Sequence, residues 1–218
     1  MTTRRLIFVF SALLFVTLML NVTGAYAEEG HHTLGIQAGE ELLSNDVSSN
    51  FSNALGFGAF FDYAASDYLE FELSWINSSH PSYGTTVING SSVGSYNLVN
   101  NSFIAALQYD FGTLDIFTPY VKGGAEFTTA SENVPVIGTL SSTAFGLDLG
   151  FGAKADIGSN LMAGLDLMYH NMFTGTATIP GTTGTINVIE SYFTVMLRFG
   201  YSFGEGGYHT GGAKPPGH

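Results

Sequence analysis

The chain has 218 residues, of which only 11% are charged while 14% are aromatic. Soluble domains carry roughly 25% charged residues, so part of this surface is expected to face something other than water. The formal net charge of -12 excludes nucleic acid as a partner, because phosphate binding needs a basic surface, and the absence of cysteine excludes disulfides and thiolate metal sites.

Residues 1–27 have the three parts of a cleavable secretory signal peptide. Arg4 and Arg5 supply the positive start, residues 6–20 are almost uninterruptedly apolar, and Ala25 and Ala27 flank a small-residue cleavage site. An uncleaved membrane helix is the weaker alternative, because a spanning helix needs about 20 apolar residues and this stretch is shorter. Cleavage after Ala27 removes two of the six basic residues, so the formal net charge becomes -14.

Eight segments of the remaining chain alternate between apolar and polar residues, which is the period of a β-strand. The clearest is residues 69–75, where four apolar side chains alternate with Glu70, Glu72 and Ser74. In chain order the predicted strands lie around residues 34–38, 55–63, 69–75, 103–111, 121–127, 145–152, 161–170 and 193–203.

The apolar row of each strand is predicted to face lipid, because the interior of an eight-stranded barrel is too narrow for so many large apolar side chains. The opposite row carries glycine, serine and isolated charges, which suits a narrow lumen. Aromatic residues near the strand ends, such as Trp75, Tyr109 and Tyr169, are interpreted as interfacial girdles.

The connections between the strands alternate between long and short. Short turns are predicted near residues 64–67, 112–118 and 156–160, and long polar loops over residues 42–53, 77–97, 128–141 and 171–187. This pattern predicts an all-β fold, an eight-stranded antiparallel up-and-down transmembrane β-barrel over residues 28–203, with long loops extracellular and both termini periplasmic. Residues 204–218 are rich in glycine, histidine and proline and are predicted to form a flexible periplasmic tail.

Three segments make the chain resemble the small bacterial outer-membrane barrels of the OmpW, OmpX and OmpA-transmembrane type: residues 119–125 (PYVKGGA), 165–169 (LDLMY) and 197–203 (LRFGYSF). The resemblance implies contact with outer-membrane lipid and lipopolysaccharide, and a role for Phe203 as the signal read by the outer-membrane insertion machinery. The family usually ends at this phenylalanine, so the tail is a departure from its pattern.

The polar row places three basic and eight acidic side chains in the predicted lumen. We expect a charged plug in which Arg198 contacts Asp166 and Glu72, with Glu70 and Lys122 near the same level. Such a cluster can be a structural filling or a gate. The other inward charges are Lys154, Asp62, Asp110, Glu126, Asp148 and Glu190.

The sequence leaves two main functions open. The first is a non-enzymatic, narrow passive pore for small hydrophobic molecules or ions, in which Phe60, Ile104, Met162, Met168 and Met196 line a path. Because acidic side chains are in excess, cations are the expected traffic of any ion pore. The second is a closed structural or adhesive surface barrel that acts through its four extracellular loops.

A lipid A-modifying enzyme is a remote alternative. It would need a serine and a histidine close together at a lipid-facing strand end, and His170 with Ser191 is the conceivable pair. His170 is interpreted as the one strand histidine of the mature chain. No histidine spacing matches a zinc site, so neither a metal nor another cofactor is expected.

Overall fold

The computed structural model describes residues 30–44, 51–83, 86–88, 91–93, 96–114, 116–134, 138–158, 160–173, 175–178 and 185–204. The predicted signal peptide over residues 1–27 and nearly all of the predicted tail lie outside these residues. Within the described part of the chain there is no helix, and therefore none long and apolar enough to cross a membrane.

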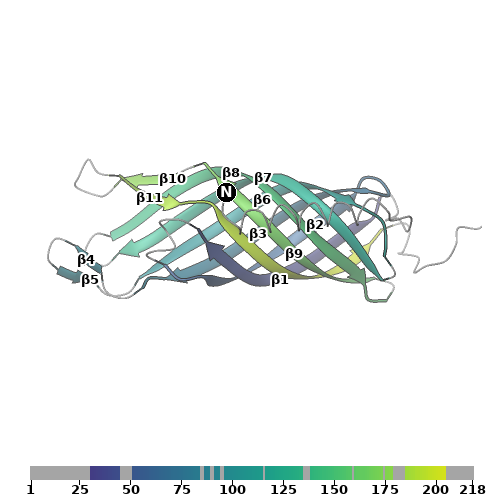
Figure 1. The fold of residues 1–218 in the computed structure, drawn as a ribbon, viewed down its shortest axis with the longest axis horizontal. Coiled ribbons are helices and arrows are strands. Elements are labelled where there is room, and N and C mark those ends of the chain that lie inside the picture. The colour runs from purple at the N-terminus through teal and green to yellow at the C-terminus, as the bar shows by residue number, and fades with distance from the viewer. Residues whose placement is uncertain are drawn as a thin grey trace, which may run out of the picture.

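Eight long strands close into one antiparallel barrel in the order β1-β12-β9-β8-β7-β6-β3-β2, as the sequence predicted (Figure 1). Each strand pairs with its neighbour along the chain, and β1 closes the barrel by pairing with β12 over its whole length. The barrel strands are β1 (His32–Leu43), β2 (Ala54–Ala64), β3 (Leu69–Pro81), β6 (Asn97–Asp110), β7 (Phe117–Val134), β8 (Gly138–Asp156), β9 (Leu161–Met172) and β12 (Tyr192–Phe203).

Two short hairpins lie at one end of the barrel, which we call the loop end (Figure 1). They are formed by β4 (Thr86–Ile88) with β5 (Ser91–Val93), and by β10 (Gly175–Thr178) with β11 (Thr185–Ile189). The opposite end, the turn end, carries the connections at residues 65–68, 111–116 and 157–160. These are the three short turns that the sequence predicted.

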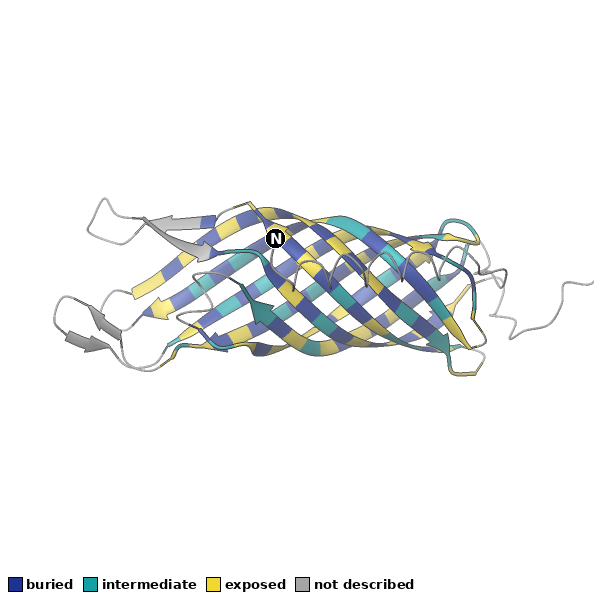
Figure 2. Cartoon of the chain, viewed as in Figure 1, coloured by how far each residue is buried: buried dark blue, intermediate teal, exposed yellow. Residues whose placement is uncertain are grey.

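Buried and exposed side chains alternate along every barrel strand (Figure 2). The apolar row is the outer one: Leu55 is 80% exposed and Leu149 is 70% exposed, although both are large and apolar. The charged row is the inner one, and Arg198 is only 2% exposed. A surface of this kind is stable in hydrocarbon and not in water, so the predicted orientation of the two faces is confirmed.

An aromatic row marks the boundary of the apolar outer face near the loop end. Phe145, Phe127, Phe103 and Trp75 pair with one another in sequence across β8, β7, β6 and β3. The next outward-facing row beyond it is polar and consists of Thr143, Thr129, Asn101 and Asn77.

The outer apolar face of β7 runs from Phe127 at this row to Phe117 at the turn end. At about 3.3 Å per residue and a tilt of about 40°, this segment spans about 25 Å along the barrel axis. That depth matches the apolar band of an outer-membrane barrel, so the polar row beyond Phe127 lies outside the hydrocarbon.

Three of the four predicted long loops contain strands, which corrects the sequence-based boundaries. Most of residues 128–141 belong to β7 and β8, which continue to Val134 and from Gly138. The prediction failed because the outer face changes from apolar residues to Thr129 and Ser131 beyond the lipid, so the alternation disappears. The inner face still buries Ala130, Val134 and Leu140, which holds the extension together. The other two regions contain the short hairpins.

Candidate functional site

The interior of the barrel near the turn end holds a group of ionisable side chains, which we call the turn-end cluster. Three basic and five acidic side chains belong to it, contributed by seven of the eight barrel strands, and each is 8% exposed or less. The members are Arg198, Lys122, Lys154, Asp62, Glu70, Glu72, Asp110 and Asp166.

Arg198 connects three carboxylates that are far apart in the sequence. Its Nη1 lies 3.0 Å from Glu72 Oε2 and 3.5 Å from Asp166 Oδ2, and its Nη2 lies 3.1 Å from Asp62 Oδ2. The guanidinium carbon lies 3.8 Å from the ring centroid of Phe60, within cation–π range. Arg198 therefore connects β2, β3 and β9 across the lumen through ion pairs, with the Phe60 ring packed against its guanidinium.

Lys122, on β7, contacts two of the same carboxylates. Its Nζ lies 2.9 Å from Glu72 Oε2 and also contacts Asp166. The hydroxyl of Tyr120 donates a hydrogen bond of 2.9 Å to the other oxygen of Asp166. Glu72 and Asp166 are thus shared between two cations, which compensates the loss of hydration on burial.

Glu70 belongs to a second half of the turn-end cluster and pairs with Lys154, not with Arg198. Lys154 Nζ lies 2.6 Å from Glu70 Oε1 and 2.7 Å from Asp110 Oδ2. The amide of Gln108 donates to both carboxylates, at 2.9 and 2.8 Å. The structure therefore places all five residues of the predicted plug in one region, and adds Asp62, Asp110 and Lys154.

The packing around Phe60 depends on glycine. A Cβ at Gly35 would overlap the Phe60 ring, and one at Gly200 would lie 3.3 Å from it. Both glycines sit on the strands that close the barrel, β1 and β12. Their missing side chains leave the space into which the ring fits beneath Arg198.

An apolar layer lies next to the turn-end cluster along the axis. It consists of Ile76, Ile104, Ala106 and Met196, all buried and in mutual contact. Because Met196 lies two residues before Arg198 on the same inner face of β12, the layer is stacked on the charged cross-section toward the loop end.

A second polar group, which we call the imidazole cluster, consists of Glu126, Asp148 and His170 and follows the apolar layer. His170 Nδ1 lies 2.8 Å from Glu126 Oε2 and 3.0 Å from Asp148 Oδ1. The ring of Tyr192 stacks on the imidazole, with centroids 4.2 Å apart and planes 9° from parallel. The sequence placed both acids in the lumen but did not bring them to His170. Which inward side chains of β7, β8 and β9 meet depends on the register between these strands, and a local sequence pattern does not give that register.

His80 and Glu41 form a further buried pair that the sequence analysis missed. His80 Nε2 lies 3.1 Å from Glu41 Oε1, and Asn100 Nδ2 donates to the same oxygen at 2.8 Å. His80 lies in the part of β3 that the sequence assigned to the loop over residues 77–97, and Glu41 lies on β1 immediately before the predicted loop over residues 42–53. His32 is also in a strand, so the interpretation of His170 as the one strand histidine is wrong.

The histidine and serine considered for an enzyme do not meet. His170 is completely buried in the lumen, and its Nε2 lies 3.0 Å from Thr194 Oγ1. Ser191 Oγ instead accepts from the Met172 amide at 3.3 Å and contacts Asn171 at 3.4 Å. The described residues therefore do not form the lipid-facing serine–histidine pair.

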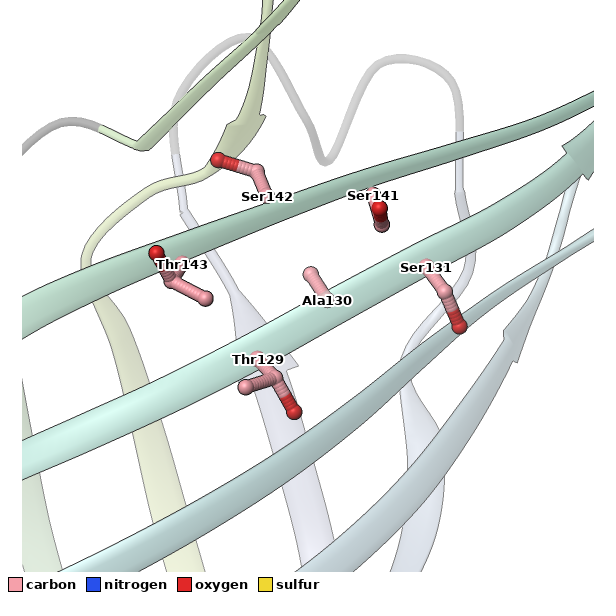
Figure 3. A pocket seen from close by; sticks show the side chains of 6 residues that line it. All are labelled: Thr129, Ala130, Ser131, Ser141, Ser142 and Thr143. Carbon is pink, nitrogen blue, oxygen red and sulfur yellow. The ribbon is translucent and has the colours of Figure 1, made fainter.

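A loop-end apolar cluster completes the filling of the barrel. It is built from inward side chains of the extended strands and of the segments beside them: Phe51, Leu98, Ala130, Val134, Leu140, Ala144, Met172, Ile189 and Tyr192. Outside it, a shallow hollow lies on β7 and β8, lined by Thr129, Ala130, Ser131, Ser141, Ser142 and Thr143 (Figure 3). This hollow is on the wall beyond the aromatic row and is dominated by hydroxyl groups.

The comparisons with known proteins agree with this architecture. Residues 10–203 match the family model described as outer membrane protein beta-barrel domain. Among solved structures, the outer membrane protein OprG from Pseudomonas aeruginosa is similar with a TM-score of 0.60 and 16% identity, over 84% of this chain and 100% of that one. No curated protein matches the chain in sequence.

Two further solved structures are similar at the level of the fold. The outer membrane protein AlkL, determined in DMPC lipid bilayers, has a TM-score of 0.53 and 16% identity over 84% of this chain and 94% of that one. Neisserial surface protein A has a TM-score of 0.51 and 16% identity over 80% of this chain and 96% of that one. At such identities the likeness concerns the fold alone.

Proposed function

Because this chain belongs to the outer membrane protein beta-barrel domain family and is a barrel of the bacterial outer membrane, we propose that it is a closed, non-enzymatic surface barrel. In this proposal the lumen is a structural filling that does not conduct. The part of the barrel beyond the aromatic row, including the extended β7 and β8 and the two short hairpins, makes the contacts that matter to the cell. This is the second of the two main functions considered from the sequence.

The observation that carries the proposal is that the lumen is filled at several successive levels. The turn-end cluster, the layer around Met196, the imidazole cluster and the loop-end apolar cluster follow one another along the axis. A pore gated at one level needs open space on either side of the gate, which this arrangement does not provide.

The side chains expected to line a hydrophobic path also support a closed barrel. Phe60, Ile104, Met162, Met168 and Met196 all face inward, and each is between 1% and 4% exposed. Ile104 and Met196 belong to the same buried apolar layer, and the ring of Phe60 packs against the guanidinium of Arg198. These residues fill the interior instead of bordering an opening, so they favour a closed lumen over the passive pore.

Planar-bilayer recording of the refolded chain tests the proposal. We expect a sealed bilayer for the wild type and also for Arg198→Ala, because Ile76, Ile104 and Met196 block the next level. Folding of each sample is checked by its heat-dependent mobility in denaturing gels. Steady ohmic current from the wild type would overturn the closed-barrel proposal and favour the pore.

The proposal also assigns the loop end to the outside of the cell and both termini to the periplasm. Beyond the aromatic row, Thr129, Ser131, Ser141 and Thr143 present hydroxyl groups at the level where lipopolysaccharide sugars begin. Hydroxyl groups donate and accept hydrogen bonds, so this face suits a sugar and phosphate layer better than hydrocarbon.

Cysteine labelling on intact cells tests this orientation, and the chain offers a clean background because it contains no cysteine. Ser141→Cys at the loop end should react with a membrane-impermeant maleimide on intact cells. Asp67→Cys, in the exposed turn between β2 and β3, should react only after the outer membrane is permeabilised. The reverse pattern would overturn the assigned orientation while leaving the closed lumen untouched.

A further inference from the structure

The imidazole cluster brings one ligand-type side chain from each of three neighbouring strands to a common point. Glu126 lies on β7, Asp148 on β8 and His170 on β9, and Asp148 and His170 are direct cross-strand partners. Their exposed fractions are 2%, 5% and 0%. One ligand atom of each lies within 4.8 Å of those of the other two.

The distances within the cluster fit the edges of a metal coordination shell. His170 Nδ1 lies 2.8 Å from Glu126 Oε2 and 3.0 Å from Asp148 Oδ1. Ligands bound at about 2.0–2.2 Å and at right angles to one another are about 3 Å apart. The imidazole nitrogen can therefore occupy a position next to each carboxylate oxygen around one ion, and the two oxygens lie within 4.8 Å of each other.

The atoms that face away from this point are held by hydroxyl groups. His170 Nε2 is within hydrogen-bond distance of Thr194 Oγ1, at 3.0 Å, and Glu126 Oε1 accepts from Thr128 and Tyr192. If Nε2 carries the proton and donates to Thr194, the lone pair of Nδ1 points at the two carboxylates. Outer contacts of this kind orient metal-binding histidines and carboxylates in proteins.

One polar atom of the cluster is left without a partner. Asp148 Oδ2 is buried and forms no hydrogen bond, although burial of an unsatisfied carboxylate oxygen is costly. A cation at the centre of the cluster, or a water bound to that cation, would satisfy this oxygen.

The charge of the cluster also favours a divalent cation. Within the described chain, the ion pairs of Arg198, Lys122 and Lys154 join carboxylates of the turn-end cluster, not Glu126 or Asp148. Two carboxylates with a neutral imidazole carry two negative charges in a buried site. A divalent ion neutralises them completely, whereas a proton on the imidazole neutralises only one.

We propose that Glu126, Asp148 and His170 bind one divalent metal ion inside the barrel. The mixed set of two oxygen ligands and one imidazole nitrogen suits a transition-metal ion such as Zn²⁺ or Mn²⁺ better than Ca²⁺ or Mg²⁺, which prefer oxygen alone. The bound ion links β7, β8 and β9 just inside the aromatic row and anchors the base of the extended β7 and β8. This site is independent of whether the barrel conducts.

Metal content and thermal unfolding of the refolded chain test the site. The chain is refolded in detergent after removal of metals, given Zn²⁺, Mn²⁺, Ca²⁺ or Mg²⁺ separately, and desalted before elemental analysis. By analogy with other buried metal sites, we expect each chain to retain about one Zn²⁺ or Mn²⁺ ion after desalting. At a free concentration a thousandfold above Kd, the unfolding midpoint should rise by about 8–16 °C, with much smaller effects of Ca²⁺ and Mg²⁺.

Matched variants locate the ion. His170→Gln and Asp148→Asn should lose both the retained metal and the rise in midpoint. His80→Gln removes an equally buried histidine beside another carboxylate, Glu41, and should keep both. Should the ligand variants fail to fold, Thr194→Val keeps every ligand, removes the contact with Nε2, and should weaken binding by about 10- to 100-fold.

Two outcomes would overturn the proposal. In the first, the wild type retains no metal after desalting and its midpoint is the same with every ion. In the second, His170→Gln retains as much metal as the wild type, which would assign the ion to histidines near the chain ends, such as His209 and His218. The electron paramagnetic resonance spectrum of Mn²⁺ added to the wild type gives an independent readout. An ion buried in the barrel tumbles slowly with the protein, whereas free Mn²⁺ tumbles fast, so the two give different spectra.

Discussion

Replacement of Arg198 by methionine is expected to destabilise the barrel strongly. Methionine has a similar length and keeps the apolar contact with Phe60, but it removes the cation that Asp62, Glu72 and Asp166 share. Lys122 remains beside Glu72 and Asp166, whereas Asp62 loses the one cation with which it forms an ion pair in the described chain.

The size of the effect follows from this burial. Removing one partner of a buried ion pair costs about 3–5 kcal/mol, because the remaining charge stays desolvated. In a protein of this length each kcal/mol lowers the unfolding midpoint by about 2–4 °C, so Arg198→Met should unfold about 6–20 °C below the wild type.

Thermal unfolding in detergent micelles, followed by β-sheet circular dichroism and by heat-dependent gel mobility, measures this change. Arg198→Lys is the first control, because it keeps a charge but loses the two-armed contact, and should fall between the two. Adding Asp62→Asn to Arg198→Met should recover part of the loss, since the uncompensated carboxylate is gone. A midpoint for Arg198→Met within about 2 °C of the wild type would refute the idea that this cross-section is held by a buried charge network.

Three other predictions concern the lipid face, biogenesis and packing. Leu149→Lys, in the middle of the apolar face, should cost about 2–4 kcal/mol of unfolding free energy in lipid vesicles, whereas Ser141→Lys beyond the aromatic row should cost about 0–1 kcal/mol; equal costs would refute the assigned band. Phe203→Ala should reduce the amount of folded barrel assembled in cells, while Phe199→Ala on the same face should not; equal refolding of both in vitro separates an insertion signal from stability. Gly35→Ala should lower the unfolding midpoint, because its methyl group would meet both the Phe60 ring and the backbone carbonyl of Phe199, at a cost of about 1–3 kcal/mol; an unchanged midpoint would show that β1 and β12 can shift to make room.

The fold class could be predicted from the sequence because it depends on local patterns of residues. Alternation with period two, as in Leu69, Glu70, Phe71 and Glu72, fixes which side chains share a face of a strand regardless of its partners. The narrow interior of an eight-stranded barrel, which cannot hold so many large apolar side chains, then decides that the apolar face is the outer one. The same reasoning failed at Thr129, where the outer face is polar and the strand is maintained by buried residues on the other side.

The membership of the lumen clusters was only partly predictable. The sequence placed Arg198 near Asp166 and Glu72 because strand lengths counted from the short turns give approximate heights. It did not assign Glu70 to Lys154, since a height does not say on which side of the lumen a long side chain points.

By itself, the sequence determined that this chain is a barrel whose apolar face contacts lipid and whose charged side chains lie inside. Only the tertiary structure decided which of those charges meet. Asp62 and Arg198 are 136 residues apart and come together through closure of β1 on β12, and Glu126, Asp148 and His170 converge through the stagger of three strands. Closure and stagger are properties of the whole sheet, so no local pattern of residues contains them.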